Sequence, residues 1–385
     1  MKKVLFVASS IGVGGMERVL VDIANALVER SYDVTIITYA IPDGDSYIDD
    51  LDSRVHFVYK EHRKFSLLSR IPYIHRFYDP KKNNWETRAS ARTLYRYYVG
   101  SQDKYDVEIA FCRGPAVKII SGSDNKNSKK YTWVHNDYTL VDPKTITNFF
   151  PDMDTTKKAY QVFDKIIAVS EEARKKFVEV IGYEDKTMTI YNMLDIDSIR
   201  KKKDLPCPEK KNGFTVISVA RIIPAKGYDT LLKAVKRLND DGYQFELWLV
   251  GTRFAGQYDR QLEGYIKDNQ LTNVKLLGRQ INPYCFMAQA DVYICSSWRE
   301  GFSISVAEAM ACGLPVISTN CTGPTEILKD GEYGILIRYD EDDMYSALKS
   351  VLDDPGILTP LIEKSLKRSE DFSSEKIIDQ VISLF

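Results

Sequence analysis

Apolar runs and helically spaced apolar residues alternate along the chain from its first residue. Residues 3–9, KVLFVAS, form a continuous apolar run, which is typical of a strand covered on both faces of a sheet. Residues 16–30 have helical spacing. The apolar residues that share one face there are Val19, Leu20, Ile23, Ala24 and Leu27. A second strand-like run follows at 33–39, so the order predicts a β-α-β unit with parallel strands.

The same alternation continues through both halves of the chain. Further strands are expected in the first half at 107–111, 130–135, 165–170 and 188–192. A second series begins at residue 214, with expected strands at 214–221, 245–251, 274–278, 291–297, 315–319 and 334–337. Its expected helices are 229–238, 258–269, 283–290 and 303–313. We therefore predict an α/β protein with two doubly wound domains facing across a cleft, and ligands beyond the carboxyl ends of the strands.

The length of 385 residues also favours two domains, because it exceeds what one hydrophobic core usually serves. We expect a Rossmann-like domain at 1–193 and a second one at 214–370. Residues 194–213 include RKKKDLPCPEKKNG, which is charged, contains proline and has no periodicity, so they are interpreted as an interdomain linker. Residues 371–385 are expected to form a helix that crosses back to the first domain.

Composition excludes several classes of protein. The chain has 53 Lys and Arg against 54 Asp and Glu, which gives no general reason to bind nucleic acid. It has four histidines and six cysteines with no CxxC pair, so a structural zinc site is not expected. The cysteines are interpreted as buried free thiols of a reducing cytosol.

The start of the chain, MKKVLFVASSIGVGG, has two lysines before an apolar run, as a secretory signal does. The run is too short for a signal and stops at a glycine-rich turn, so we interpret it as the first buried strand. No run of 18 apolar residues occurs, and no membrane span is expected.

A glycine-rich turn follows the first strand. Gly12, Gly14 and Gly15 precede the first helix, and backbone N–H groups at such a turn can receive an anion. A dinucleotide fingerprint would need a further glycine where Glu17 stands, and the strand at 33–39 has no acid at its end to hold a ribose. A dehydrogenase is therefore disfavoured, and an ordinary strand-to-helix turn stays an alternative.

Two cations follow the strand that opens the second half. Arg221 and Lys226 lie five residues apart, on either side of a proline. A guanidinium fork and an ammonium at the end of a strand suit a diphosphate. The alternative is that both are ordinary surface residues.

Two carboxylates follow the strand 291–297. Glu300 comes directly after it, and Glu308 lies about two turns along the next helix. A carboxylate can accept hydrogen bonds from vicinal hydroxyls, as acids do when they recognise ribose. A solvated helix face is the alternative, but the helix is otherwise small and apolar, and a buried glutamate needs partners.

Taken together, these motifs resemble a known family. SWREGFSISVAEAMACGLPVISTNCTGPTEIL resembles the E-x7-E region of retaining glycosyltransferases of family GT4, which have the GT-B fold. SVARIIPAKGYDTLLKA resembles the phosphate-binding segment of that family, and GVGGMERVLVDIANAL its glycine-rich loop and helix. IIAVSEEARKKF and TIYNMLDIDSI resemble the end of its first domain, although Met193 and Leu194 replace the usual glycine and valine. The resemblance covers residues 1–40 and 130–350.

The resemblance implies a role for each motif. Glu308 would hold the nucleotide ribose, and Glu300 would lie by the donor sugar. Arg221 and Lys226 would neutralise the diphosphate. The other residues implied in donor binding are Gly14, Gly15, the main-chain groups of Phe302 and Ser303, and Thr325, which is less firmly matched, as is the neighbouring Glu326.

The family also places a His or Asp after the strand 130–135. His135 is therefore expected to contact the sugar or acceptor, with Asp137 second to it; a satisfied loop residue is the alternative reading of His135. Glu300, His135, Arg221 and Lys226 form the expected catalytic set. The D-x-D sequences at 50–52, 152–154 and 195–197 follow no strand, so no metal and no cofactor are expected.

The implied function is a retaining hexosyl- or N-acetylhexosaminyltransferase. It would use a nucleotide-diphosphate sugar, UDP-sugar being favoured, and a glycan or lipid-linked saccharide acceptor in cell-surface polysaccharide synthesis. The alternatives are a sugar-nucleotide epimerase or hydrolase of the same fold, and a non-catalytic partner of an active transferase.

Residues 54–104 change the expected location of the protein. They hold twelve Lys or Arg against four Asp or Glu, together with ten aromatic residues. Such a segment suits an anionic membrane surface or a lipid-diphosphate acceptor. We expect a cytoplasmic protein that binds peripherally at the inner face of the plasma membrane; a helical face with inward aromatics and solvated cations is the alternative.

Overall fold

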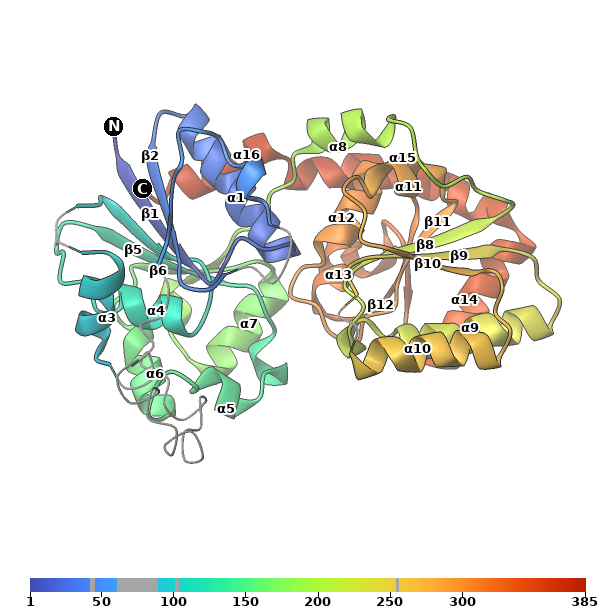
Figure 1. The fold of residues 1–385 in the computed structure, drawn as a ribbon, viewed down its shortest axis with the longest axis horizontal. Helices are drawn as coiled ribbons and strands as arrows, with labels where there is room; N and C mark the ends of the chain where they lie inside the picture. Colours follow the sequence, from blue (N-terminus) through green and yellow to red (C-terminus); the bar gives the residue numbers. More distant parts are fainter. Residues whose placement is uncertain (42–45, 61–88, 101–103, 254–255) are drawn as a thin grey trace, which may run out of the picture. The chain divides into compact units, whose positions relative to one another are not determined.

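The computed structural model describes residues 1–41, 46–60, 89–100, 104–253 and 256–385. The chain forms two compact units (Figure 1). The first consists of Met1–Tyr191 with Ile378–Phe385, and the second is Asn192–Ile377. Each unit has its own parallel sheet between layers of helices, so the prediction of two doubly wound α/β halves is confirmed.

The first unit has a seven-stranded sheet in the order β3-β2-β1-β4-β5-β6-β7. Its strands are β1 Lys3–Ala8, β2 Asp33–Thr38, β3 His56–Tyr59, β4 Val107–Ala110, β5 Lys129–Val134, β6 Lys165–Ala168 and β7 Thr187–Thr189. Its helices are α1 Gly15–Glu29, α3 Ala91–Tyr98, α4 Pro115–Ile120, α5 Pro143–Ile146, α6 Met153–Tyr160 and α7 Glu171–Val180. The strand order reverses between β1 and β4, which lie side by side.

The second unit repeats this plan with a six-stranded sheet in the order β10-β9-β8-β11-β12-β13. Its strands are β8 Thr215–Val219, β9 Glu246–Val250, β10 Val274–Gly278, β11 Val292–Cys295, β12 Val316–Thr319 and β13 Ile335–Ile337. Its helices are α8 Ile196–Lys203, α9 Tyr228–Asp240, α10 Gln257–Asp268, α11 Tyr284–Gln289, α12 Ile304–Ala311, α13 Thr322–Ile327, α14 Glu341–Asp353 and α15 Thr359–Ser369, followed by α16 Ser374–Ile382. The order reverses between β8 and β11.

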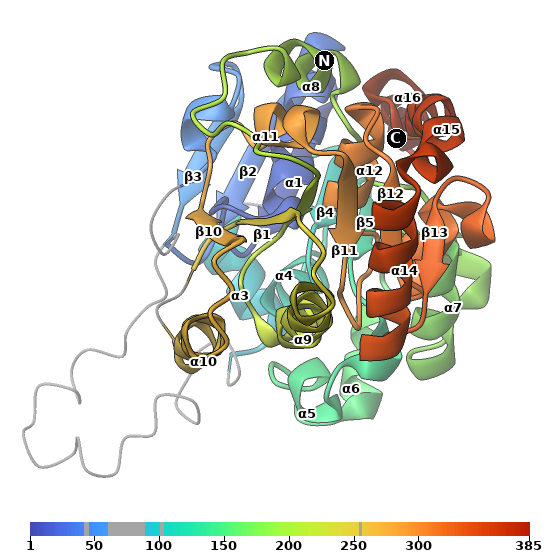
Figure 2. The ribbon, with the colours of Figure 1, turned by 90° about the vertical axis from the view of Figure 1, so that its right-hand side faces the viewer.

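The burial of the strands explains why the apolar runs predicted them. The central strands β4, β9 and β11 are buried along their whole length, whereas the edge strand β10 is half-buried. In the second unit, α9, α10 and α14 cover one face of the sheet and α8, α11, α12 and α15 the other (Figures 1 and 2). Right-handed crossovers in opposite directions from the reversal point produce this arrangement.

The segment interpreted as a linker, 194–213, contains helix α8. Asp195 accepts a hydrogen bond from the Ser198 amide and begins the helix, and Ile196 and Ile199 bury its apolar side. The helix packs on α11 and α12. Four basic residues fill its last turn, where cations suit the negative end of the helix dipole, and this charge hid the helical periodicity.

The C-terminal residues return to the first sheet. Helix α16 runs from the second unit, and Ile378–Phe385 belong to the first. The Phe385 ring stacks on Tyr131 with centroids 6.1 Å apart, and the Tyr131 hydroxyl donates to the Leu384 carbonyl.

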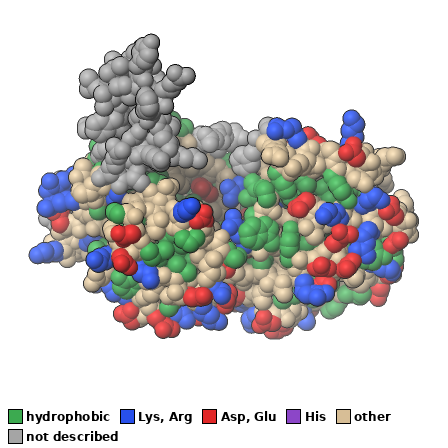
Figure 3. Space-filling view, turned by 90° about the horizontal axis from the view of Figure 1, so that it is seen from below, with side chains coloured by type: hydrophobic (Ala, Val, Ile, Leu, Met, Phe, Trp, Pro, Cys, Tyr) green, Lys and Arg blue, Asp and Glu red, His purple; other side chains and the backbone are tan. Residues whose placement is uncertain are grey.

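Lys or Arg and Asp or Glu side chains are interspersed on the face shown in Figure 3, in keeping with their near-equal totals. None of the helices among the described residues is both long enough and apolar enough to cross a membrane. Most of the basic, aromatic segment 54–104, from 61 to 88 and from 101 to 103, lies outside the described residues.

Candidate functional site

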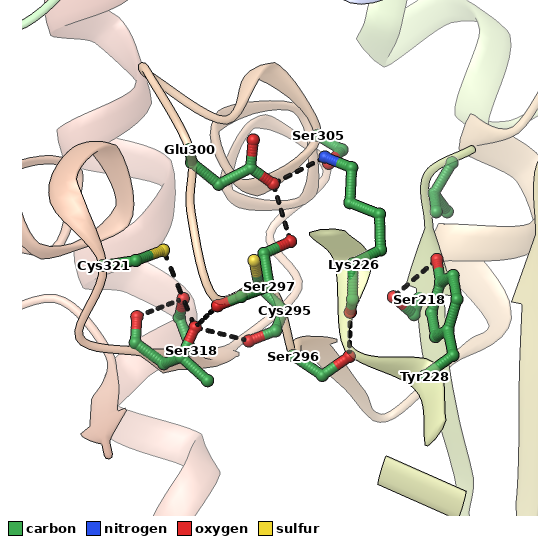
Figure 4. Close-up of polar contacts among 12 residues, drawn as sticks. Ser218, Lys226, Tyr228, Cys295, Ser296, Ser297, Glu300, Ser305, Ser318 and Cys321 are labelled. Carbon is green, nitrogen blue, oxygen red and sulfur yellow. Dashed lines mark hydrogen bonds and ion pairs between the residues drawn. The ribbon is translucent and has the colours of Figure 1, made fainter. Parts of the chain in front are cut away.

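Lys226 and Glu300 meet where the strand order of the second unit reverses. Lys226 follows β8 and Glu300 follows β11, and these two parallel strands are neighbours. The Lys226 Nζ lies 2.6 Å from the Glu300 Oε1 (Figure 4), and the side chains are only 16% and 12% exposed. Ligands of open α/β sheets bind at this kind of reversal point. Two residues 74 positions apart in sequence are thus joined by an ion pair.

Hydrogen bonds to backbone carbonyls hold together the loops that follow β8 and β11. The Ser296 hydroxyl donates to the Lys226 carbonyl at 2.7 Å, and the Trp298 amide donates to the Ala225 carbonyl at 3.1 Å. Gly227 has φ +65°, and a Cβ there would lie 2.1 Å from the Ser296 carbonyl oxygen. The close approach of the loops therefore requires glycine at 227.

The charge state of the pair follows from its surroundings. Burial acts to lower the pKa of Lys226, but the Glu300 carboxylate raises it, and the resulting pKa is above its ordinary value. The positive charge of Arg221 lowers the pKa of Lys226, so Arg221 lies within electrostatic range of the pair. The Ser297 hydroxyl donates to the same Glu300 Oε1 at 2.7 Å. The site therefore holds a protonated lysine against a carboxylate that already accepts two hydrogen bonds.

Glu308 lies on α12 and is held by a residue that sequence reasoning missed. The Tyr284 hydroxyl, at the start of α11, donates to the Glu308 Oε1 at 2.8 Å. Asn282 fixes the start of α11, because its Oδ1 accepts from the Tyr284 amide at 3.2 Å and its Nδ2 donates to the Lys202 carbonyl of α8 at 2.7 Å. A single tyrosine in an apolar segment carries no sequence signal for this role.

Phe302, Ser303 and Thr325 lie in the loops around α12 and α13. The Phe302 ring is buried edge-on against Phe372, with centroids 5.2 Å apart. Ser303 is left-handed, with φ 73°, and begins α12. The hydroxyls of Ser303 and Thr325 are buried without a hydrogen-bond partner among the described residues. Such orphaned hydroxyls are uncommon in folded proteins, and at Ser303 the orphaned hydroxyl coincides with a left-handed backbone, a combination that favours a binding role.

Thr325 also lines a cavity of about 340 Å³. The other lining residues are Asn320, Asp330, Leu336, Ile337, Arg338 and Asp343. The neighbouring Glu326 contributes its carbonyl to a buried arginine, Arg368, which also binds the Ile327 carbonyl at 2.9 Å. Arg368 thereby fixes the end of α13.

Gly14, Gly15 and His135 belong to the first unit. Gly14 precedes α1 and Gly15 begins it, directly beyond β1. His135 follows β5, and its Nε2 lies 2.9 Å from the Phe111 carbonyl oxygen, which can only accept. Burial lowers the pKa of His135 to about 4, so the ring is neutral at pH 7, with its proton on Nε2. Asp137 accepts from the Thr139 amide at 2.9 Å, a local turn contact.

The D-x-D sequences have structural roles in the described chain. Asp152 accepts from the Thr155 amide at 2.7 Å and begins α6, and Asp195 begins α8 in the same way. Asp50 pairs with Arg18. Within the described residues, no three His, Cys, Asp or Glu side chains gather closely enough to hold a metal ion.

Two family patterns match consecutive parts of this chain. The pattern of glycosyl transferases group 1 matches residues 198–368, and that of glycosyltransferase family 4 matches residues 13–198. Together they span both units, including all ten residues expected to form the site.

Individual glycosyltransferases are also similar to this chain. An uncharacterized glycosyltransferase of Haemophilus influenzae is 25% identical over 386 residues, which is 99% of each chain. The Campylobacter jejuni N-acetylgalactosamine-N,N'-diacetylbacillosaminyl-diphospho-undecaprenol 4-alpha-N-acetylgalactosaminyltransferase is 31% identical over 197 residues, 50% of this chain and 51% of that one.

Solved structures share the fold. Anabaena HepE, solved with UDP and glucose, has a TM-score of 0.75 at 20% identity, covering 100% of this chain and 99% of that one. Sucrose-phosphate synthase from Thermosynechococcus elongatus has a TM-score of 0.75 at 18% identity, covering 100% and 98%. The chain therefore belongs to the group 1, family 4 glycosyltransferases and has their GT-B fold.

Proposed function

We propose that this glycosyltransferase moves a hexose or N-acetylhexosamine from a UDP-sugar to a glycan or lipid-linked saccharide, with retention of anomeric configuration, in cell-surface polysaccharide synthesis. The observation that carries the proposal is the Lys226–Glu300 pair at the reversal point of the second sheet. The names of the relatives support the acceptor class, since one acts on a diphospho-undecaprenol saccharide and another, from Staphylococcus aureus, is a capsular polysaccharide biosynthesis glycosyltransferase.

The donor would bind to the second unit. Glu308 would accept hydrogen bonds from the ribose hydroxyls, and Arg221 and Lys226 would bind the diphosphate. The orphaned hydroxyls of Ser303 and Thr325 support this, because a bound donor would supply the partners that they lack. UDP is proposed as the nucleotide because a protein of the same fold was solved with UDP and glucose.

The chemistry proposed needs no protein nucleophile. The bond between the anomeric carbon and the phosphate oxygen breaks, and the acceptor hydroxyl forms the new bond on the same face of the sugar. The proton of that hydroxyl passes to the departing phosphate. Lys226 would exchange its contact with Glu300 for the phosphate and stabilise the negative charge that develops there. No metal or cofactor is included in this proposal.

His135 would act as an acceptor of hydrogen bonds in the first unit. Its Nε2 proton is directed at the Phe111 carbonyl, so the Nδ1 lone pair is the remaining polar site of the neutral ring. A sugar or acceptor hydroxyl could donate to it. Acceptor binding by the first unit, and peripheral membrane contact through the basic segment 54–104, belong to the same proposal.

A nucleotide screen tests the donor assignment. Thermal unfolding would be followed with UDP, GDP, ADP and CDP at matched concentrations. We expect UDP to stabilise most, by about 2.7 kcal/mol at 100 times its dissociation constant. If another nucleotide stabilises the protein more than UDP, the base of that nucleotide replaces uracil in the proposal. If no nucleotide stabilises the protein, the proposal is contradicted.

A further inference from the structure

Arg113 stands at the reversal point of the first sheet with part of its guanidinium unsatisfied. It follows β4, the neighbour of β1. Its Nη1 is buried, and it has no hydrogen-bond partner among the described residues. The residue as a whole is partly exposed, but a buried N–H of a charged group without an acceptor is costly, and arginine cannot escape the cost by losing its proton. Such a group persists where a ligand completes it.

The backbone at this position is held in a conformation that a side chain would strain. Gly114 has φ +77° and ψ −121°, and a Cβ there would meet the Phe149 ring at 3.0 Å. Pro115 follows as the first residue of α4, where its fixed φ suits the helix. The turn thus fixes the Arg113 backbone just beyond the carboxyl end of β4.

The surroundings of Arg113 are polar, but none of the residues that the structure describes places an acceptor at hydrogen-bonding distance of Nη1. The Tyr138 and Tyr160 hydroxyls lie 2.7 Å apart and bond to each other. Burial raises the pKa of Tyr138 to about 12, and the charge of Arg113 acts against this rise, so the guanidinium lies within electrostatic range of the pair. Two residues before Arg113, the Phe111 carbonyl oxygen accepts a hydrogen bond from the His135 Nε2–H.

We propose that Arg113 binds an oxyanion, phosphate or carboxylate, of the acceptor substrate at the carboxyl end of the first sheet. A guanidinium presents parallel N–H groups that match both kinds of oxyanion. Ligands of a doubly wound sheet bind at this reversal point, and His135 directly follows the neighbouring strand, β5. Assigning the oxyanion to the acceptor rests on the proposed function. The binding of an oxyanion by Arg113 is independent of it.

Thermal stability separates a binding arginine from a structural one. Arg113→Met removes the unsatisfied charge and keeps most of the aliphatic bulk, so we expect the melting temperature to stay the same or rise. The matched control is Arg174→Met in the same unit, because Arg174 Nε binds Glu171 at 2.9 Å and its loss should lower the melting temperature. A fall for Arg113→Met as large as that of the control would overturn the proposal.

Anion binding tests the site directly. Calorimetric titrations with inorganic phosphate, pyrophosphate and glucuronate would be made in saturating UDP, so that the donor site is filled. We expect at least one anion to bind the wild type and to bind Arg113→Met roughly tenfold more weakly or worse, with Arg113→Lys in between. Equal binding to wild type and Arg113→Met, or no binding of any of the three to the wild type, would overturn the proposal.

Steady-state kinetics decide whether the anion is part of the acceptor. Arg113→Met should raise the acceptor KM and leave the UDP-sugar KM unchanged. A rise in the donor KM instead would overturn the acceptor assignment. Failure of the proposed function can be told apart from failure of the Arg113 site. In the first case the wild type would not bind UDP, while the anion titrations could still succeed.

Discussion

A lysine and a glutamate 2.6 Å apart neutralise each other until a stronger anion competes for the lysine. Lys226 would suit the proposed exchange because its charge is preserved in a mostly buried position, and Ser297 would remain to hold Glu300 if the lysine bound a phosphate. The pair is therefore ready for a diphosphate without an unpaired buried charge in the free protein.

Removing either cation should affect turnover more than donor binding. Lys226→Ala and Arg221→Ala lose charge that matters most when the diphosphate departs, so we expect kcat to fall by on the order of 100-fold with a smaller rise in the donor dissociation constant. Steady-state kinetics would measure kcat, and calorimetry would measure the donor dissociation constant. Equal losses in the two quantities would show ground-state binding instead.

His135 should make stability depend on pH. Its pKa is about 4 in the folded protein and near 6.5 in the unfolded chain, so the unfolded state takes up the proton first as pH falls. The stability that the neutral ring contributes is complete above about pH 6.5 and is lost toward pH 4, by up to about 3 kcal/mol. Denaturant unfolding across this window should be flatter for His135→Asn. Parallel curves for the two proteins would refute the assignment.

At the scale of elements, α11 and α12 are coupled through one hydrogen bond. Tyr284 from α11 holds Glu308 of α12, and Asn282 ties the start of α11 to α8. Ribose recognition would thus depend on the relative placement of three helices, one of which lies in the segment expected to be a linker.

Glu308→Ala should weaken UDP binding by about 1.5–3 kcal/mol, because the ribose hydroxyls lose a charged acceptor. Tyr284→Phe should weaken it less, by about 0.5–1.5 kcal/mol, and should have no further effect when Glu308 is already alanine. Tyr243→Phe is the matched control, since the Tyr243 hydroxyl binds Asp353 at 2.7 Å before β9, at the opposite end of the sheet. Calorimetry giving the same UDP affinity for Glu308→Ala as for the wild type would remove Glu308 from the site.

The sequence predicts most of the strands and the clearly amphipathic helices, but it misses elements whose pattern is dominated by charge. Strands such as β1 and β11 are apolar throughout, so they stand out without any tertiary information. Helix α8 has a basic last turn and only two buried isoleucines, so charge dominates its pattern. Motif spacing singles out Glu300 and Lys226 as candidates, but Tyr284 and Arg113 are single residues whose proposed roles come from contacts, or their absence, in three dimensions.

At the scale of the whole molecule, the charge of residues 54–104 is the feature that most concerns location. We predict that the protein sediments with anionic vesicles at low salt, since basic residues near such a surface contribute about 1 kcal/mol each. Binding should fall with salt and again when Arg63, Lys64, Lys81 and Lys82, which lie outside the described residues, become glutamine. Absence of binding at low salt would favour an acceptor in solution.

The central claim, transfer from a UDP-sugar with retention, is tested most directly by the anomeric configuration of the product. UDP-glucose, UDP-galactose and their N-acetylamino counterparts, labelled with ¹³C at C1, would be incubated in EDTA with lipid-linked and free saccharide acceptors and followed by NMR. The account predicts that one of them gives an acceptor-linked sugar with the α configuration of its donor. A β-linked product, or release of free or epimerised sugar without transfer, would contradict it.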